Sequence, residues 1–398
     1  MDFVYRPIAP EEADDFIRAE ARAFGWQIRD EELPTYPPLR EFDRTLAAFE
    51  NGQIAGNVRV VSSRMNVPGG SLPIGGVAMV WVQPTYRRRG VMRELMSRQL
   101  RAIHERGEPL SSLTASEGSI YGRVGYGIGS VHERWTIESQ YTEFARPYNS
   151  EGRLRLVSPQ EMRRSFPEVY SRANEGRPGA IHLSEQFWDG VVMDFTPPGS
   201  ESGPFFHLAH ERDGRIDGYA RYRTGGHRVL VDELMSVSVE ACAALWRFCF
   251  DLDLMRSTEA VQRPVDDPLP WMLADPRRLR RTPADGVWVR LVDVAAALAG
   301  RRYMREERLV IEVHDSFCSW NEGRYELEGS SEGARCRRTG ARPDLTMSAA
   351  DLAATYLGAV SFATLFSAGR VEAHTSGALR KADSMFPADL KPWGPHDF

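Results

Sequence analysis

The sequence predicts an α/β (α+β) protein of three domains, and three observations support this class. Val77–Val82 is a short apolar run rich in β-branched residues, typical of a buried strand. Apolar residues then recur three or four apart from Val91 to Ile103, which is typical of a helix. The same order of elements recurs beyond Asn149, in a chain whose 398 residues exceed the roughly 150 of an average domain.

The turn between this strand and this helix carries three consecutive arginines and a glycine, Arg87 to Gly90. The unpaired N–H groups of a helix N-terminus and the arginine charges would converge on one point, which favours an anion. Gly90 would let the backbone approach that anion closely. On these four residues alone, a solvated basic turn in an ordinary strand-to-helix connection is the alternative.

Composition excludes several classes of protein. With 55 acidic and 50 basic residues the net charge is −5, which argues against a general nucleic-acid binder and favours cationic ligands. The four cysteines lack C-x-x-C spacing and are expected to be reduced thiols, and the nine histidines lack metal-ligand spacing, so no metal is expected. Without a signal-like N-terminus or a run of about 18 apolar residues, we expect a cytoplasmic protein with no membrane partner.

The motif Arg87-Arg88-Arg89-Gly90-Val91-Met92 after a strand resembles the pyrophosphate-binding signature R-x-x-G-x-[A/G] of GCN5-related N-acetyltransferases (GNATs). Met92 departs from the usual small residue. The chain resembles the enhanced intracellular survival (Eis) family in three features: this departure, the preceding Gln83–Tyr86 and the later ASEGSIYGRVGYG of Ala115–Gly127. The resemblance covers essentially the whole chain. It implies two tandem GNAT-like domains, residues 1–149 and 150–290, followed by a sterol-carrier-protein-like domain, residues 291–398.

Individual elements of the first domain follow from local patterns. Strands are expected at Phe3–Ile8 and Leu110–Ala115, and a helix from Pro10 to Gly25. A hairpin is expected around Asn51-Gly52, since Asn-Gly supplies the two positive φ angles of a type I′ turn. Trp26–Arg40, rich in proline and charge, is expected to be a mobile loop beside the site.

The second domain repeats this order without the basic turn. Glu211–Gly218 resembles the first hairpin, and a strand around Val229–Val237 precedes a helix from about Val239 to Leu254. Between Met235 and Cys242 the sequence SVSVEA contains neither arginine nor glycine. We therefore expect a second GNAT-like domain that cannot hold a pyrophosphate. Chance similarity between two α/β stretches is the alternative.

The resemblance also implies contacts with acetyl-CoA. Backbone N–H groups of the strand would bind the acetyl carbonyl and the pantetheine amides, and the basic turn would bind the pyrophosphate. The implied cofactor-binding residues are Val80, Val82, Arg87, Arg88, Gly90, Val91 and Ser116.

Two tyrosines compete for the role of general acid toward the departing thiolate, because a phenol with a pKa near 10 is protonated at neutral pH. By the family's motif the acid is the first of them, Tyr121, and Tyr126 is then a packing residue. A glycine-flanked core aromatic is the alternative for either.

The family resemblance assigns a role to the end of the chain as well. The terminal carboxylate of Phe398 would reach the N-terminal site as the proton acceptor. Because its ordinary pKa is about 3.5, it must gain from desolvation, or work through water while it anchors the amine. Asp397 would add a second negative charge, and Phe24, Trp26 and Met79 are expected walls of the substrate pocket.

Together these features predict an acetyl-CoA-dependent N-acetyltransferase that acts on primary amines of a cationic small molecule by direct attack in a ternary complex. The resemblance implies aminoglycosides as substrates and a homohexamer as the assembly. The alternatives are acetylation of polyamines or protein lysines and, from another class, a lipid-binding protein with a degenerate transferase domain. The intact basic turn argues against degeneracy.

Overall fold

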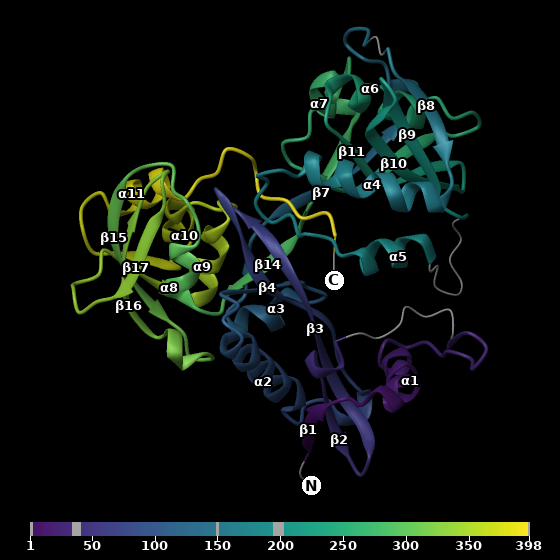
Figure 1. Ribbon diagram of the computed structural model, residues 1–398. Coiled ribbons are helices and arrows are strands. Elements are labelled where there is room, and N and C mark those ends of the chain that lie inside the picture. Colours follow the sequence, from purple (N-terminus) through teal and green to yellow (C-terminus); the bar gives the residue numbers. More distant parts are fainter. Residues whose placement is uncertain (1–2, 34–40, 149–150, 194–202, 397–398) are drawn as a thin grey trace. The chain divides into compact units, whose positions relative to one another are not determined.

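The computed structural model describes residues 3–33, 41–148, 151–193 and 203–396 (Figure 1). The chain divides into two compact units. Unit 1 comprises Met1–Ser130, Pro178–Ile181 and Val287–Phe398, and unit 2 comprises Val131–Arg177 and His182–Gly286.

A seven-stranded sheet forms the N-terminal domain, in the spatial order β1-β2-β3-β4-β5-β14-β6. Its strands are β1 Val4–Pro7, β2 Thr45–Glu50, β3 Gln53–Val67, β4 Gly70–Val82, β5 Leu110–Thr114, β6 Gly127–Ile128 and β14 Val287–Leu291. The expected hairpin between β2 and β3 is confirmed, with φ angles of 51° at Asn51 and 79° at Gly52. Strand β4 starts earlier than the apolar run suggested, because its polar first half pairs with the long β3.

Helices cover both faces of this sheet. A 3-10 turn at Pro10–Glu12 leads into α1, Ala13–Ala23, which packs its apolar stripe on the face that carries Ala47, Phe49 and Trp81. The opposite face is covered by α2, Val91–Glu105, and by the short α3, Gly118–Tyr121. The sequence predicted α1 and α2 correctly because each carries apolar residues at helical spacing.

Unit 2 contains a second sheet with the order β13-β7-β12-β11-β10-β9-β8. Its strands are β7 Val131–Glu138, β8 Arg153–Val157, β9 Phe206–Arg212, β10 Arg215–Gly225, β11 Arg228–Ser236, β12 Ser257–Pro264 and β13 Arg280–Asp285. Its helices are α4 Pro159–Ala173, α5 Glu185–Met193, α6 Val239–Phe250 and α7 Leu269–Met272. Helix α4 stacks Phe166 on Tyr219 of β10 with ring centroids 4.1 Å apart, while α6 packs on a separate apolar cluster. The second α/β domain is therefore present.

The structural division departs from the expected boundaries at 149/150 and 290/291. Strand β7 lies before residue 149 but belongs to the second sheet, where it pairs with β12 and β13. Strand β14 lies before residue 291 but belongs to the first sheet, between β5 and β6. Local pattern identifies a strand, whereas its place depends on which sheet edge accepts its hydrogen bonds, and that edge can be far away in sequence.

The third domain is a five-stranded sheet with helices, as predicted. Its strand order is β17-β16-β15-β18-β19. The strands are β15 Glu307–His314, β16 Gly323–Gly329, β17 Ala334–Arg338, β18 Leu345–Ser348 and β19 Val371–Ala373, and the helices are α8 Val294–Ala299, α9 Ala349–Tyr356, α10 Phe362–Ser367 and α11 Ala378–Met385.

A buried polar cluster joins this domain to the first sheet. Arg290 of β14 forms an ion pair of 2.5 Å with Asp315, and the two side chains are 0% and 2% exposed. Asn321 donates to Asp315 Oδ2 and to the carbonyls of Leu291 and Val292. The opposite charges of Arg290 and Asp315 compensate each other's burial, although the Nε of Arg290 has no hydrogen-bond partner among the described residues.

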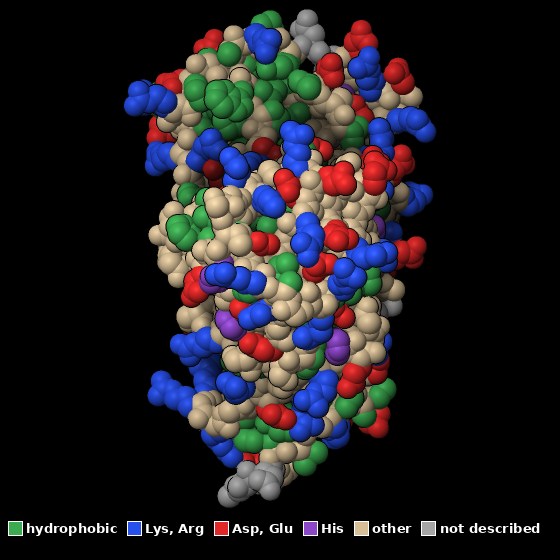
Figure 2. All heavy atoms as spheres, turned by 90° about the vertical axis from the view of Figure 1, so that its left-hand side faces the viewer, with side chains coloured by type: hydrophobic (Ala, Val, Ile, Leu, Met, Phe, Trp, Pro, Cys, Tyr) green, Lys and Arg blue, Asp and Glu red, His purple; other side chains and the backbone are tan. Residues whose placement is uncertain are grey.

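The surface carries mixed charge. Figure 2 shows Lys and Arg side chains interspersed with Asp and Glu side chains over the face that it presents. This agrees with the small net charge of −5. Among the described residues no helix is long and apolar enough to cross a membrane.

Candidate active site

Strand β4 carries a bulge at the centre of the predicted site. Asn57 of β3 pairs with Trp81 and Arg59 pairs with Ala78, so Met79 and Val80 together face the single residue Val58. Met79 has a φ of 50°, a left-handed conformation that is uncommon outside glycine. The Nδ2 of Asn57 donates to the Met79 carbonyl at 2.9 Å. A bulge takes backbone groups out of the ladder, which leaves them available to a ligand.

The edge of β4 beyond this point is open on the side of β5. The parallel pairing of β4 with β5 covers only Ile74–Gly76, and β4 continues to Val82 without it. Val80 and Val82 are both half-exposed along this edge. A chain of amides such as pantetheine could therefore add to β4 as a further strand would.

The basic turn leads from this edge to the N-terminus of α2. Gly90 has a φ of 81° and is the N-cap residue, with open space where a side chain would lie. Arg89 forms an ion pair of 2.5 Å with Glu50, whereas Arg87 and Arg88 are exposed and form no ion pair with any described residue. The Nε of Arg87 donates to the Val82 carbonyl at 3.3 Å, but neither guanidinium is paired with a carboxylate of the described residues. The turn thus presents two arginine charges beside unpaired helix N–H groups, a favourable site for an anion.

The two candidate tyrosines differ in their surroundings. Tyr126 is buried, and its hydroxyl lies 2.7 Å from that of Ser111, which in turn donates to the Gly75 carbonyl. Tyr121 is 6% exposed, and burial raises its pKa, while the nearby Ser116 hydroxyl lowers it. Tyr126 is therefore held by a structural hydrogen-bond chain, and Tyr121 remains protonated at neutral pH.

The expected pocket walls lie just after α1 and on the bulge. Phe24 is 53% exposed, Met79 is 39% exposed and Trp26 is half-exposed. Exposed aromatic and thioether groups of this kind suit a pocket that is filled only when a ligand is bound. Residues 34–40 of the expected loop lie outside the described part of the chain.

The described end of the chain is docked on unit 1. The N–H of Trp393 donates to the Pro178 carbonyl at 2.8 Å, and its side chain is 4% exposed. Residues 178–181 are themselves fastened to β3, where the N–H of Asn66 donates to the Ala180 carbonyl at 2.8 Å. Asp397 and Phe398, which the sequence placed in the site, lie outside the described residues.

Sequence reasoning missed a buried polar cluster on the α1 face of the bulge. Glu20 of α1 is 5% exposed and interacts with Arg59 of β3 and Trp81 of β4. The spacing in the sequence indicates this position, because Glu20 lies four residues after Phe16 and therefore on the apolar face of the helix.

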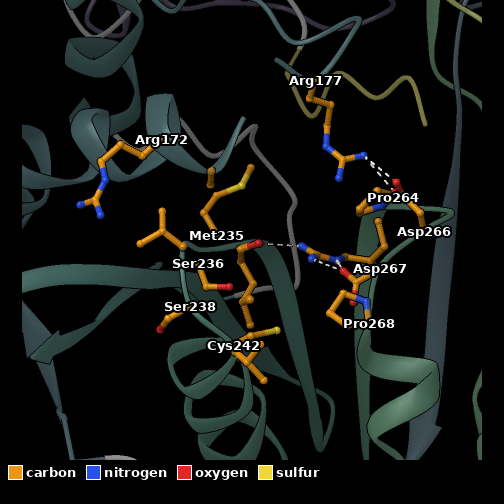
Figure 3. A pocket seen from close by; sticks show the side chains of 15 residues that line it. Arg172, Arg177, Met235, Ser236, Ser238, Cys242, Pro264, Asp266, Asp267 and Pro268 are labelled. Atoms are coloured by element: carbon orange, nitrogen blue, oxygen red, sulfur yellow. Dashed lines mark hydrogen bonds and ion pairs between the residues drawn. The ribbon is translucent and has the colours of Figure 1, made fainter. Parts of the chain in front are cut away.

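The second sheet has a corresponding opening, shown in Figure 3, but it is occupied by the chain's own groups. Strands β11 and β12 pair only as far as Val231 and Ala260. Beyond that point Arg263 donates to the Leu234 carbonyl and pairs with Asp267 at 2.5 Å. An internal guanidinium thus crosses the gap that a pantetheine arm would need.

The N-terminus of α6, which borders the same opening, is also satisfied internally. Ser238 caps the helix by accepting from the Ala241 N–H, and its hydroxyl donates to Asp217 at 2.9 Å. The Asp217 carboxylate places negative charge where α2 has arginines. These contacts support the prediction that the second domain holds no pyrophosphate.

The described residues contain no group of three or more His, Cys, Asp or Glu side chains arranged to hold a metal ion. All four cysteines are free. Burial raises the pKa of Cys242 and Cys249 to about 12, so neither is a reactive thiolate.

Known proteins share this sequence and architecture. Residues 4–129 and 179–291 each match a family described as an acetyltransferase (GNAT) domain, and residues 294–395 match a sterol carrier protein domain. An uncharacterized N-acetyltransferase of Streptomyces avermitilis is 40% identical over 389 residues, 95% of each chain. N-acetyltransferase Eis of Mycobacterium tuberculosis is 34% identical over 355 residues, covering 86% of this chain and 85% of that protein. The crystal structure of Eis1 from Mycobacterium abscessus has a TM-score of 0.84 at 32% identity, covering 99% of this chain and 100% of that one.

The fold, the bulged strand with its basic turn and these relatives define a GCN5-related N-acetyltransferase, an enzyme of the acyltransferase class. Within that class the chain belongs to the Eis family, with two GNAT domains and a sterol-carrier-like domain.

The basic turn yields a direct prediction. Replacing Arg87 and Arg88 together with alanine removes charge-assisted contacts to phosphate, each typically worth about 1.5–3 kcal/mol, so the affinity for CoA should fall severely without unfolding. Isothermal titration calorimetry measures this affinity and should give one CoA per chain in the unaltered protein. Arg89→Ala is the matched control, because Arg89 pairs with Glu50 and its loss should affect stability more than affinity. Unchanged CoA affinity in the double variant would contradict the assignment.

Proposed function

We propose that this enzyme transfers the acetyl group of acetyl-CoA to primary amines of cationic small molecules, aminoglycosides among them, by direct attack in a ternary complex. The observation that carries the proposal is the continuity of the bulge at Met79, the open edge of β4 and the two unpaired arginines before α2. That path offers the groups that a pantetheine arm followed by a pyrophosphate would bind.

The chain's own groups take complementary roles in this proposal. Backbone groups of Val80 and Val82 polarise the acetyl carbonyl and hold the pantetheine, and Ser116 adds a cofactor contact. Tyr121 donates a proton to the departing thiolate. The terminal carboxylate of Phe398 accepts the proton that the attacking amine loses, directly or through water. Asp397 adds a second negative charge that anchors the cationic substrate, and Phe24, Trp26 and Met79 line its pocket.

The proposal is tested by measuring thiol release from acetyl-CoA with a panel of amines. The panel contains kanamycin as the aminoglycoside, spermine as a polyamine and a lysine-containing peptide. We expect turnover with kanamycin, because several closely spaced ammonium groups suit a site with carboxylate counter-charges. Turnover with spermine or the peptide alone would transfer the function to polyamine or protein-lysine acetylation, and thiol release with none of the amines would refute an amine substrate.

The acid role of Tyr121 predicts the behaviour of Tyr121→Phe. This change keeps the ring and deletes the donor, so kcat should fall by roughly 10²–10⁴-fold while CoA affinity is retained. Because burial raises the pKa of Tyr121, the unaltered enzyme should keep its protonated acid beyond the ordinary value of 10.0. Tyr126→Phe should mainly lower stability through loss of the Ser111 contact. An inactive Tyr126→Phe beside an active Tyr121→Phe would reverse the assignment.

The catalytic role proposed for the terminal carboxylate predicts the effect of tags. A few residues appended after Phe398 convert its carboxylate into an amide, which carries no charge, and their bulk would crowd the pocket. We expect a C-terminal tag to abolish amine acetylation and an N-terminal tag to preserve it, with CoA binding intact in both. Full activity of the C-terminally extended enzyme would show that the terminal carboxylate is dispensable.

Family membership also leads us to propose a homohexamer that works in the cytoplasm. Light scattering coupled to size-exclusion chromatography measures the assembly directly.

A further inference from the structure

A buried side-chain amide holds the bulge of β4 from the neighbouring strand. Asn57 of β3 is 0% exposed, and its Nδ2 donates to the Met79 carbonyl at 2.9 Å. The reversed amide would place its Oδ1 against that carbonyl, and two acceptors in contact repel each other, so the chemistry requires this orientation. The amide therefore fixes the carbonyl of a residue whose φ of 50° departs from strand geometry.

This hydrogen bond also sets the direction of the next N–H group. A trans peptide group points its carbonyl oxygen and its N–H to opposite sides, and the described residues contain no cis peptide bond. Because the Met79 carbonyl is directed at Asn57, the Val80 N–H is directed away from Asn57. Asn57 lies on β3, and the opposite side of β4 has no strand partner beyond Gly76.

The Val80 N–H is the group that the proposed function assigns to the acetyl carbonyl of acetyl-CoA. A donor stabilises the charge that develops on an oxygen best when it is already oriented toward that oxygen before the reaction. A peptide group at a bulge lacks the ladder hydrogen bonds that hold its neighbours, so it rotates more easily than they do. The amide of Asn57 supplies the missing constraint.

The second domain lacks this arrangement at the corresponding place. Tyr219 of β10 corresponds to Asn57, because both follow the glycine of the repeated hairpin and both pair with the penultimate residue of the next strand. The Tyr219 hydroxyl donates to Glu233 at 2.7 Å, and its ring stacks on Phe166. All residues of β11 are described, and none of them has a positive φ. The domain with the blocked gap thus lacks the amide and the left-handed residue together, whereas the domain with the open edge has both.

The amide of Asn57 is kept although it is unfavourable for stability. Its Oδ1 is buried and accepts no hydrogen bond from any described residue. An apolar side chain of similar size would avoid this unsatisfied acceptor. Buried polar atoms without partners are uncommon in proteins, and departures of this kind are concentrated at functional sites.

We propose that Asn57 is a positioning residue that orients the Val80 N–H toward the acetyl carbonyl, an inference that rests on the proposed function. The amine nitrogen bonds to the carbonyl carbon, and the carbonyl oxygen carries the negative charge until the carbon–sulfur bond breaks. The Val80 N–H donates to that oxygen throughout. Asn57 contacts neither the acetyl group nor the amine and acts only through the Met79–Val80 peptide group.

The test is isotope-edited infrared spectroscopy of acetyl-CoA labelled with carbon-13 at its carbonyl, bound without an amine to the unaltered enzyme and to Asn57→Leu. A hydrogen bond to the oxygen weakens the C=O bond, so the band should lie at lower frequency in the unaltered enzyme than in free acetyl-CoA. Asn57→Leu keeps the size of the side chain and deletes the donor, so most of this displacement should disappear. The affinity for CoA, which lacks the acetyl group, should be unchanged.

Turnover with kanamycin gives a second readout. In Asn57→Leu kcat should fall by roughly 10–10²-fold, less than the roughly 10²–10³-fold typical of deleting such a donor, because the N–H remains but is no longer oriented. Asn57→Gln keeps the amide on a longer arm and should recover part of the rate and part of the band displacement.

Asn174→Leu is the matched control. Asn174 of the second domain is also buried, and its Nδ2 donates to a backbone carbonyl, that of Tyr170, at 3.0 Å. Its replacement should lower stability in urea denaturation and leave the acetyl band and kcat unchanged.

An undiminished band displacement in an Asn57→Leu enzyme that binds CoA would identify a purely structural amide and overturn the inference, with the proposed function left standing. If Asn57→Leu does not fold, Asn57→Ala, which introduces no clash, is judged by the same criterion. Absence of any displacement in the unaltered enzyme would instead refute the carbonyl contact that the proposed function assigns to Val80, and the inference with it. Because the infrared experiment contains no amine, its result does not depend on which amine is the substrate.

Discussion

The site depends on one strand from the far end of the second domain's sequence, β14, which completes the first sheet and carries Arg290. The buried pair of Arg290 with Asp315 fastens the third domain to that sheet, and removing one partner of such a pair typically costs about 3–5 kcal/mol. Because the third domain is fixed in this way, the chain that leaves it can dock Trp393 on residues 178–181. The described segment up to Trp393 is thereby held in the same unit as the N-terminal sheet.

Strand β4 holds one residue in an uncommon backbone conformation at the proposed acetyl site. Met79 has a positive φ, and the buried Oδ1 of the neighbouring Asn57 has no hydrogen-bond partner among the described residues. Elsewhere in the same domain, charged side chains such as Arg44 and Glu108 are paired even when buried. Strain and unpaired groups persist where the surrounding fold enforces them, and they are concentrated at functional sites.

The two GNAT domains show that the fold by itself does not determine the activity. In both domains a strand leads into a helix, and the parallel partner of that strand pairs with only part of its length. In the first domain the gap is open and the helix begins after Arg87 and Arg88, whereas in the second Arg263 crosses the gap and Asp217 lies at the helix N-terminus. The chemistry resides in these few side chains and not in the shared architecture.

The sequence by itself determined the elements and the cofactor motif, because helical periodicity, the Asn51-Gly52 turn and the basic turn before Val91 depend on neighbours within a few residues. A contiguous motif in the sequence also led to the proposal that Tyr121 is the general acid. Tertiary structure alone decided that β7 and β14 belong to sheets other than those expected, since a strand's partner is chosen among edges that lie far apart in sequence. Tertiary structure likewise decided that Glu20 faces Arg59 beneath the bulge, because a carboxylate on α1 and a guanidinium on β3 meet only once the helix has packed on the sheet.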